Sequence, residues 1–389
     1  MKILVVCQNY YPEQFRITDI CEELVKRGNE VTVVTGLPNY PEGQIFDGYK
    51  HGKKRDETIN GVNVHRCFTI GRRSGILFRV LNYYSFAISS SKYVKKLKED
   101  FDVVLVNQLS PVMMAKAGVV YKKKHGTKLV LYCLDLWPES LAVKGIRRGS
   151  FVYKHYKKVS EKIYNKADKI LVTSERFSGY FKDKFGIENV QYLPQYAETL
   201  FDSEKCLKEP DGFIDLMFAG NIGVAQSVTT IIEAAKLTQD IKNLRWHIVG
   251  DGSESKNVKA LAKDLSNVIF YGAKPLSEMP KYYSMADAML VTMEYDDIIS
   301  LTLPGKVQSY LSAGKPIIGA ADGETKRVIE DACCGYCGDS GNAEQLAENV
   351  RKFIANKDKY AFVENAKSYY SEYFAIDRFF DGLTSVLKE

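Results

Sequence analysis

The feature that most constrains the fold of this chain is a regular alternation of short apolar runs with amphipathic segments. Residues 2–8 (KILVVCQ) are almost entirely apolar, and similar runs recur at 30–36, 102–108 and 128–135. Such continuous apolarity is typical of parallel strands that are buried on both faces of a sheet. Most of the intervening segments show helical spacing of their apolar residues, as 17–28 does. Strands that alternate with helices predict βαβ units, and therefore an α/β fold with a doubly wound parallel sheet.

The alternation stops once and then restarts. Residues 193–212 carry two prolines and many charges without a sustained period, which indicates a linker. Apolar runs resume at 214–221 and continue as far as 315–321, so we expect two tandem Rossmann-like domains. The last residues are helical in pattern but too apolar to stand alone, so they should pack back toward the N-terminal domain. The expected boundaries are 1–194 for the N-terminal domain, 195–212 for the linker, 213–368 for the C-terminal domain and 369–389 for the C-terminal helical segment.

Composition narrows the classes of function. With 389 residues, of which 45% are hydrophobic and 26% charged, the chain fits a globular protein that can bury sizeable cores. No apolar run approaches the ~18 residues of a membrane span. The first residues, MKILVVCQNY, lack the small-residue cleavage site of a secretory signal, so we expect a cytoplasmic protein. No nucleic-acid-binding module is recognisable, and no nucleic-acid partner is expected.

The cysteines raise the question of a metal site, and the basic residues raise that of an anion-binding surface. Cys334 and Cys337 form a C-x-x-C pair, but no second pair or nearby histidine follows, so no metal site is expected. The net charge of +6 is concentrated in the first third of the chain. These basic residues indicate either solvated helix faces or a surface that meets anionic lipid or a phosphate-bearing acceptor. Interleaved aromatic residues in 72–86 (RRSGILFRVLNYYSF) would suit an amphipathic segment on a bilayer.

Loops that follow the strands are the natural candidates for a ligand site, because ligands of open α/β sheets bind beyond the carboxyl ends of the strands. The loop after the first strand, QNYYPEQFRIT, has no glycine, and the absence of a G-x-G-x-x-G motif disfavours a nicotinamide dehydrogenase. In the second half, AGNIG (219–223) and VGDG (249–252) each follow a strand, and PGK (304–306) opens a helix. Three such turns at one edge of one sheet predict a pocket for a negatively charged nucleotide.

Lys306 is the residue of this pocket that most needs explanation. It stands at a helix start, where the dipole is positive and a lysine is locally unfavourable. Either the lysine points into water or an anion lies nearby. Beside the glycine turns, its ammonium group would supply the point charge that neutralises a diphosphate.

Taken together, these motifs resemble those of bacterial family four glycosyltransferases. The resemblance spans nearly the whole chain and is strongest to a branch that builds capsule and O-antigen units with N-acetylamino sugars such as N-acetylfucosamine. The segments that carry it are FAGNIGVAQSV, IVGDG, PGKVQSYLSAGKPIIGAADGE, YYPE, LPNYPEG, LDLWPES and YLPQYAE. It implies a GT-B fold, in which two Rossmann domains face a cleft, the second holding a nucleotide-sugar donor and the first the acceptor.

The same resemblance implies the reaction and its partners. It indicates a retaining, metal-independent transfer from a nucleotide sugar, usually a UDP sugar, with no cofactor beyond this donor. A lipid-diphosphate-linked saccharide would be the acceptor, which would place the protein peripherally on the inner face of the cytoplasmic membrane. Retention would need no protein nucleophile, since the leaving diphosphate could itself accept the proton of the incoming hydroxyl. The enzyme would then act mainly by stabilising charge on the diphosphate.

On the donor side, the resemblance carries over unevenly. It implies that the donor is bound by Gly220, Asn221, Gly223, Gly250, Asp251, Gly252 and Lys306. The Arg…Lys pair that many members place near the first turn is replaced by Asn221 and Gln226. Two glutamates common in the wider family fall on Leu301 and Ser309, so both carboxylates are missing. We expect Glu324 to supply the ribose contact instead.

On the acceptor side, the candidates are carboxylates and polar residues at strand ends. Asp135 and Glu139, in DLWPES, could orient an acceptor hydroxyl or take its proton, although Asp135 could equally cap a helix. Glu13 and Arg16 follow the first strand; Arg16 could contact a phosphate, and a solvated loop and helix start is the alternative for both. Asn39 and Tyr40, in LPNYPEG, could line the acceptor side.

Two other functions stay open at this point. A nucleotide-sugar 2-epimerase shares the two-domain architecture but needs no acceptor. A non-catalytic sugar-nucleotide-binding protein would keep the glycine turns and tolerate the loss of Asp135 and Glu139.

Overall fold

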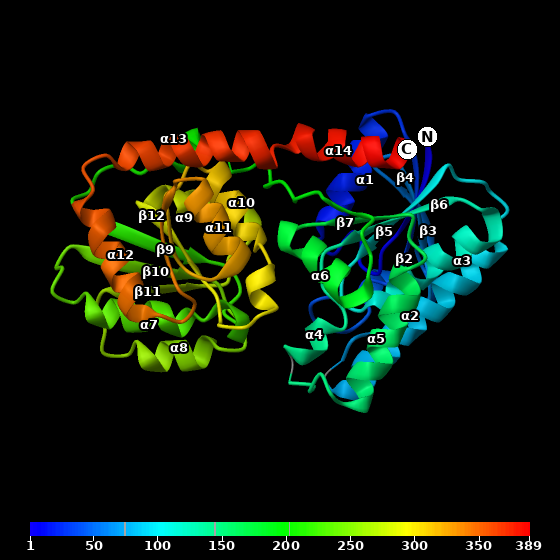
Figure 1. Cartoon of the computed structure of the whole chain (residues 1–389), viewed down its shortest axis with the longest axis horizontal. Coiled ribbons are helices and arrows are strands. Elements are labelled where there is room, and N and C mark those ends of the chain that lie inside the picture. The colour runs from blue at the N-terminus through cyan, green and yellow to red at the C-terminus, as the bar shows by residue number, and fades with distance from the viewer. Residues whose placement is uncertain (74, 144, 202) are drawn as a thin grey trace. The chain divides into compact units, whose positions relative to one another are not determined.

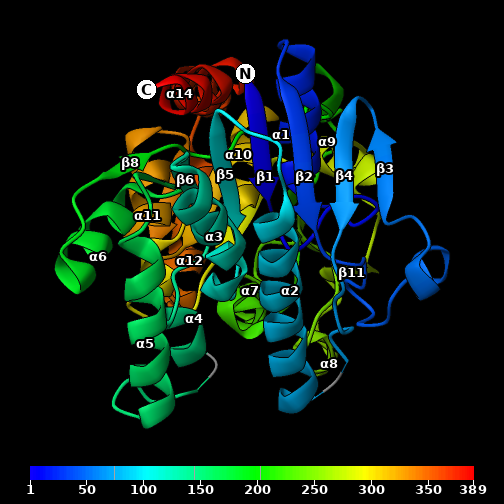
Figure 2. The same ribbon diagram turned by 90° about the vertical axis from the view of Figure 1, so that its right-hand side faces the viewer.

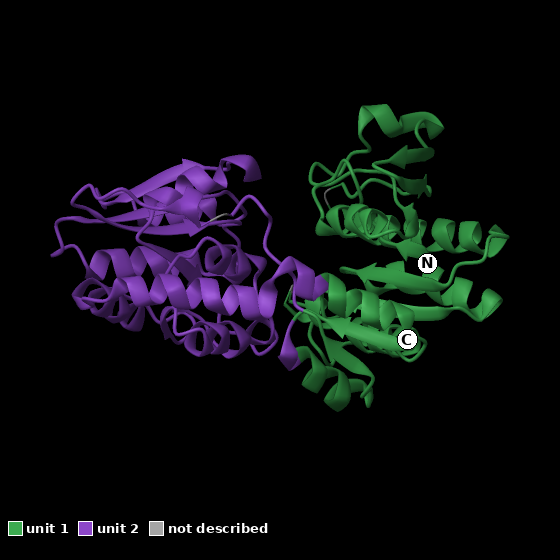
Figure 3. Ribbon diagram, turned by 90° about the horizontal axis from the view of Figure 1, so that it is seen from above, with its two compact units in different colours: residues 1–173, 177–193, 380–389 green, residues 174–176, 194–379 purple. Residues whose placement is uncertain are grey.

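The computed structural model describes residues 1–73, 75–143, 145–201 and 203–389. The chain forms two compact units, drawn in Figures 1 and 3. Ser74, in the expected amphipathic segment, and Asp202, in the expected linker, lie outside the described residues. Unit 1 comprises residues 1–173, 177–193 and 380–389, and unit 2 comprises 174–176 and 194–379.

Unit 1 is built on an eight-stranded sheet in the order β3-β4-β2-β1-β5-β6-β7-β8 (Figure 2). All neighbouring strands are parallel except β3 and β4, which pair antiparallel at one edge. The strands are β1 (Lys2–Val6), β2 (Glu30–Thr35), β3 (Asp56–Ile59), β4 (Val62–Arg66), β5 (Val103–Gln108), β6 (Lys128–Cys133), β7 (Lys169–Val172) and β8 (Val190–Tyr192).

The helices of unit 1 connect these strands in the order that the apolar runs predict. They are α1 (Arg16–Lys26), α2 (Ile76–Lys96), α3 (Lys116–His125), α4 (Glu139–Ala142), α5 (Phe151–Tyr164) and α6 (Glu175–Phe185), of which the first two residues of α6 belong to unit 2. In β1, four of five residues are buried, and Ile3 pairs with Val31 on one side and Val103 on the other. This explains the almost unbroken apolar run at the start of the sequence.

Unit 2 is a six-stranded, all-parallel sheet in the order β11-β10-β9-β12-β13-β14. The strands are β9 (Ile214–Ala219), β10 (Leu244–Val249), β11 (Val268–Gly272), β12 (Ala288–Thr292), β13 (Ile317–Ala320) and β14 (Gly335–Gly338). The helices are α7 (Val228–Leu237), α8 (Ser255–Leu261), α9 (Met279–Met285), α10 (Gly305–Ser312), α11 (Gly323–Asp331), α12 (Ala343–Ala355) and α13 (Lys359–Tyr369).

Helices cover both faces of the unit 2 sheet, and the residues of β9 alternate between them. Leu216 and Phe218 pack in a cluster with the apolar residues of α7 and α12, whereas Met217 and Ala219 pack in a second cluster with those of α9 and α10. The two helix layers are visible on either side of the strands in Figure 1. This is the doubly wound arrangement that the strand–helix alternation predicts.

The two segments at the borders of the units are packed rather than loose. In the expected linker, 195–212, Ala197, Phe201 and Cys206 are buried in the core of unit 2. At the C-terminus, α14 (Ile376–Lys388) runs from unit 2 into unit 1, where the guanidinium of Arg27 lies 4.8 Å from the centroid of the Phe380 ring. Among the described residues, no helix is long and apolar enough to cross a bilayer.

Candidate functional site

Two glycine turns meet at the carboxyl edge of the unit 2 sheet. The first, residues 220–223, follows β9, and the second, 250–252, follows the neighbouring β10. The amide of Ile222 donates to the carbonyl of Asp251 at 2.9 Å, and the amide of Glu254 donates to the carbonyl of Ile222 at 2.9 Å. The two turns are therefore fastened to each other through their backbones.

Glycine is required at two of these positions by backbone conformation and by space. Gly220 has φ +142° and Gly250 has φ +143°, in a region that side chains rarely adopt. A Cβ on Gly250 would collide with the carbonyl oxygen of Gly220. A Cβ on Gly220 would lie 2.8 Å from the amine nitrogen of Lys306. The absence of a side chain at Gly220 thus provides the space into which the lysine reaches.

Helix α10 begins at this edge and directs Lys306 toward the first glycine turn. Pro304 is its N-cap, with φ −64° and ψ 135°, and Gly305 is its first residue. The Nζ atom of Lys306 lies 3.7 Å from the centroid of the Phe218 ring, which is a close cation–π contact. Nζ is covered by surrounding atoms and has no hydrogen-bond partner among the described residues. Burial lowers the pKa of Lys306 from 10.5 to about 7.

A buried amine without a counter-ion is costly, because its charged form loses water and gains no partner. The start of α10 adds unpaired backbone N–H groups and the positive end of a helix dipole to the same corner. The turn after β9, the start of α10 and Lys306 together form what we call the phosphate corner. Its chemistry fits an anion that carries several oxygen acceptors.

The phosphate corner lies where ligands of such sheets usually bind. From β9 the chain runs outward to β10 and β11, and then returns to place β12 on the other side of β9. The crevice at such a reversal, beyond the carboxyl ends, is the usual ligand site of a doubly wound sheet. The loops on its two sides are joined, since Thr292 Oγ1 donates to the carbonyl of Gln226 at 2.6 Å and the amide of Glu294 donates to that of Ala225 at 3.0 Å.

The other predicted residues of the two turns hold the turns in shape. Asn221 Nδ2 donates to Gln226 Oε1 at 3.0 Å. Asp251 is exposed, and its Oδ1 accepts from the amide of Gly252 at 2.8 Å. The neighbouring Ser255 hydroxyl and this amide lower the pKa of Asp251 below its ordinary value. Both side chains are at the predicted edge, with their polar atoms partly committed to the turns.

Near the position where the family's second glutamate is missing, the structure supplies a different carboxylate. Ser309, on α10, donates its hydroxyl to Glu198 Oε2 at 3.2 Å. The carboxylate thus lies beside the helix that begins with Lys306, about one turn further along. Sequence reasoning missed Glu198; its only signal was its place in the motif YLPQYAE, which carried part of the family resemblance.

Glu324, the predicted ribose contact, is already engaged within unit 2. Its side chain is fully buried at the start of α11. It accepts hydrogen bonds from Arg327 Nη2 at 2.9 Å and from the amide of Glu175 at 3.2 Å, and Arg176 Nε lies 3.8 Å away. A ribose hydroxyl would have to compete with these partners for its oxygens.

In unit 1, Asp135 lies in the loop after β6 and bridges to the neighbouring loop. Its Oδ2 accepts from the amide of Ser110, which follows β5, at 2.9 Å. The nearest following helix, α4, has Pro138 as its N-cap and makes no side-chain cap bond. Asp135 therefore does not cap a helix. It is half-buried at the carboxyl edge of the sheet, a position from which it could contact an acceptor.

Glu139 lies only four residues further on, but its environment is quite different. The side chain is fully buried, and Oε1 accepts from Tyr153 at 2.6 Å and from Tyr180 at 3.3 Å. Arg148 Nε lies 3.0 Å from Oε2, and Lys184 Nζ lies 3.3 Å from Oε1. Burial alone would raise the pKa of Glu139, but the bonds from Tyr153 and Arg148 and the charge of Lys184 lower it. A carboxylate with four partners is built to hold the fold, which makes Asp135 the better placed candidate of the two.

The carboxylate of Glu13 is also buried, and it brings Asn39 and Tyr40 together. Glu13 Oε1 accepts from the amides of Asn39 and Tyr40, both at 2.7 Å. Burial raises the pKa of Glu13, although the two amides partly oppose the shift. Asn39 is itself buried and accepts from the amide of Arg72 at 3.0 Å, whereas the ring of Tyr40 is 48% exposed. Of these residues, Tyr40 is the one that can meet a ligand without rearrangement.

Arg16 is the first residue of α1 and is half-buried. It thus lies beyond the carboxyl end of β1, as the sequence indicated.

Two protein-family models match the chain in succession. The model described as Glycosyltransferase Family 4 matches residues 14–195, and the model described as Glycosyl transferases group 1 matches residues 202–369. The first match falls in unit 1 and the second in unit 2, apart from residues 174–176 and 194–195.

Among curated proteins, the chain is similar to two bacterial glycosyltransferases over most of its length. It is 26% identical to the putative colanic acid biosynthesis glycosyl transferase WcaI of Escherichia coli K12, over 91% of this chain and 92% of that protein. It is 25% identical to the probable glycosyltransferase WbjE of Pseudomonas aeruginosa, over 74% of this chain and 76% of that protein.

Solved structures establish the fold. A sucrose-phosphate synthase from Thermosynechococcus elongatus superposes with a TM-score of 0.74 at 14% identity, covering 100% of this chain and 98% of that one. Anabaena Alr3699/HepE, solved in complex with UDP and glucose, superposes with a TM-score of 0.71 at 16% identity, covering 100% of both chains. The expected GT-B fold, with two Rossmann-like α/β domains and parallel sheets, is confirmed.

Proposed function

We propose that this chain, which belongs to the glycosyltransferases, transfers a sugar from a UDP-linked donor to a saccharide acceptor. It has a family 4 domain followed by a group 1 domain in the GT-B fold. The transfer would take place during the assembly of a surface polysaccharide. The observation that carries the proposal is the phosphate corner, where the Lys306 amine is buried without a partner among the described residues. The colanic acid relative supports the polysaccharide context, and the UDP complex of the Anabaena neighbour supports UDP as the carrier.

The proposed chemistry follows from the charges at this corner. When the sugar leaves, negative charge builds on the diphosphate, and preorganised donors stabilise it most where they already point at it. Lys306 supplies a compact positive charge, and the turn after β9 and the start of α10 supply N–H groups. With this cation in place, the transfer needs no metal. Retention of configuration follows if the diphosphate, rather than a protein side chain, takes the proton of the acceptor hydroxyl.

For the acceptor side, we propose unit 1, with Asp135 orienting the incoming hydroxyl and Tyr40 offering an exposed ring. The family resemblance favours an N-acetylamino sugar as the transferred group and a lipid-diphosphate-linked saccharide as the acceptor. Arg16, beyond β1, would contact the diphosphate of such an acceptor.

A lipid-linked acceptor requires access to a membrane, and unit 1 has a surface of the right kind. Ile76 and Leu77, at the start of α2, are 81% and 67% exposed, and Phe151, at the start of α5, is 85% exposed. Both helix starts lie at the same end of unit 1 (Figure 2). Arginines flank the first and lysines the second, as in segments that bind anionic bilayers.

The donor is tested by a thermal-shift screen of the full chain against nucleotide sugars, because a ligand that binds the folded state raises its Tm. A shift with UDP sugars that Lys306→Ala abolishes is expected. The reaction is tested by incubation with UDP-N-acetylglucosamine, with and without a lipid-linked saccharide. Product that forms only with the acceptor supports transfer, whereas a 2-epimer formed without it would support an epimerase.

Membrane binding is tested separately by flotation with liposomes that contain or lack phosphatidylglycerol. The chain should float with the anionic liposomes, and the double variant Ile76→Ser/Leu77→Ser should float less. Leu237→Ser, at a 48% exposed leucine of unit 2, is the matched control. No flotation of the unmodified chain with either liposome would remove this part of the proposal.

A further inference from the structure

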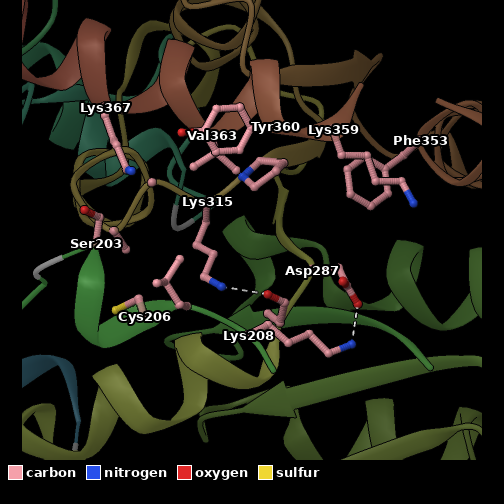
Figure 4. A pocket seen from close by; sticks show the side chains of 15 residues that line it. Ser203, Cys206, Lys208, Asp287, Lys315, Phe353, Lys359, Tyr360, Val363 and Lys367 are labelled. Carbon is pink, nitrogen blue, oxygen red and sulfur yellow. Dashed lines mark hydrogen bonds and ion pairs between the residues drawn. The ribbon is translucent and has the colours of Figure 1, made fainter. Parts of the chain in front are cut away.

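A second pocket of unit 2 lies at the opposite edge of its sheet from the phosphate corner. It has a volume of ≈ 250 Å³, and its walls come from the residues just before β12 and β13, from 203–208 and from α12 and α13 (Figure 4). All strands of this sheet are parallel, so residues that precede strands and residues that follow strands lie at opposite edges. The pocket, which we call the lysine pocket, is therefore a separate site.

The lining of the lysine pocket is strongly basic. Its charged members are four lysines and one carboxylate, namely Lys208, Lys315, Lys359, Lys367 and Asp287. Two of the lysines are paired with carboxylates: Lys208 Nζ lies 2.6 Å from Asp287 Oδ2 and 2.7 Å from Asp215 Oδ2, and Lys367 Nζ lies 3.1 Å from Glu364 Oε1. Within the described ranges, Lys315 and Lys359 form no ion pair. Each of these two lysines thus brings to the pocket a positive charge that no ion pair among the described residues neutralises.

Lys315 is the more unusual of these two residues. It is only 6% exposed, and its amine donates to the backbone carbonyl of Ala286 at 2.7 Å, as Figure 4 shows. Ala286 is the C-cap of α9, so part of the role of Lys315 is to cap that helix. The carbonyl of Ala286 accepts one of the three N–H groups of the ammonium and carries no charge that could balance it. Burial consequently lowers the pKa of Lys315 from 10.5 to about 8.

The remaining walls leave space for a ligand larger than water. Lys359 Nζ lies 5.0 Å from the centroid of the Phe353 ring, so it stays close to the pocket wall. Leu207 and Tyr360, which are 62% and 69% exposed, add apolar surface. The volume is several times that of a single water molecule, which occupies about 30 Å³ in the liquid.

We propose that the lysine pocket binds a small phosphate-bearing anion, with Lys315 and Lys359, which form no ion pair within the described part of the chain, supplying the positive charges. Lysine ammonium groups bind phosphate as point charges with several rotatable donors. The pocket lies at the end of α10 opposite to Lys306, since Ala313, the C-cap of α10, is part of its lining. One helix therefore joins the bound anion to the phosphate corner.

The proposal is tested by calorimetric titration of inorganic diphosphate into the full chain at constant ionic strength. The titration is made in the Lys306→Ala background, because diphosphate would also bind at the phosphate corner of the unmodified protein. One binding event should remain in Lys306→Ala. A further Lys359→Gln substitution should weaken it roughly tenfold or more, since a hydrogen-bonded charge is lost. Lys357→Gln, which removes the same charge at an exposed site two residues away, should leave it unchanged.

A Lys315→Gln substitution provides the second arm. It should weaken diphosphate binding at least as much as Lys359→Gln; circular dichroism and Tm then establish that the cap on α9 has not been lost with the charge. The proposal is overturned if Lys306→Ala gives no more heat with diphosphate than with sodium chloride. It is equally overturned if Lys359→Gln and Lys357→Gln weaken binding alike, which would indicate general charge screening. Because every arm lacks Lys306, these outcomes do not depend on the proposed transferase activity.

Discussion

Lys306 in unit 2 and Glu139 in unit 1 are both buried ionisable residues, and their surroundings are opposite. Glu139 has four polar partners, two tyrosine hydroxyls and two cations. Lys306 has an aromatic ring beneath its amine and no hydrogen-bond acceptor in the part of the chain that is described. A buried charge with a full set of partners stabilises the fold, whereas one that lacks them is costly until a ligand binds. The difference separates a structural carboxylate from a binding cation.

The largest effect should come from removing that cation. We expect Lys306→Ala to lower turnover by roughly 10²–10³, as the loss of one preorganised donor to a developing oxyanion does. Initial rates with a UDP sugar and an acceptor measure it. Lys281→Ala, at an exposed lysine of the same unit, and Cys334→Ala, at a buried thiol whose pKa burial raises to about 12, should each keep most of the activity. Equal losses in all three variants would contradict the role of Lys306.

Removing the satisfied carboxylate should affect stability instead. Glu139→Ala leaves Tyr153 and Tyr180 without their acceptor and Arg148 without its counter-ion, and should lower the free energy of unfolding by about 2–4 kcal/mol. Urea denaturation measures the change. Glu188→Ala breaks an exposed pair with Lys182 and should change it by less than about 1 kcal/mol. If Glu139→Ala kept full stability but lost turnover, Glu139 would have to be reassigned to catalysis.

Asp135 lies only four residues before Glu139, so its replacement tests whether two neighbouring carboxylates differ in the same way, one acting in the reaction and the other in the fold. Asp135→Asn keeps the oxygen that accepts from Ser110 but loses the charge, so we expect little change in Tm and a fall in kcat of roughly tenfold to a hundredfold. The Kd for UDP should stay the same, because unit 2 holds the nucleotide. A weaker UDP complex with unchanged kcat would place Asp135 on the donor side instead.

The smallest effect is expected at Glu198. If its carboxylate helps to hold the donor beside α10, Glu198→Gln should weaken UDP binding by roughly threefold to tenfold, the contribution of about one hydrogen bond. Glu209→Gln, at an exposed residue of the same segment, is the control. Identical Kd values for the two variants would mean that Glu198 takes no part in holding the donor.

Much of the fold could be predicted from the sequence, because parallel strands buried on both faces leave apolar runs that cannot be missed. Strand β3 could not be predicted, since three of the four residues of DETI at 56–59 are polar and the strand lies at an edge of the sheet. The buried contacts of 195–212 were also missed, because its three core residues are separated by charged ones and show no period.

The candidate site could be predicted only where its signal is local. The glycine turns and Lys306 follow strands or open a helix, so sequence order places them at one edge. Three of the four partners of Glu139 are 9, 14 and 41 residues away, and Glu198 is 111 residues from Ser309. Such contacts depend on tertiary packing, which a single sequence does not reveal. The same holds for the lysine pocket, whose lysines come from three separate segments.

The most direct test of the central claim is the number of protons taken up when UDP binds at pH 8. With a pKa of about 7 in the free protein, the Lys306 amine is mostly neutral at this pH. A diphosphate beside it stabilises the charged form and raises the pKa, so binding must take up a proton, and affinity must fall as the pH rises above 7. Titration calorimetry in two buffers of different ionisation enthalpy measures the uptake. The account predicts close to one proton for the unmodified chain and almost none for Lys306→Ala; no uptake in either, or the same uptake in both, would contradict it.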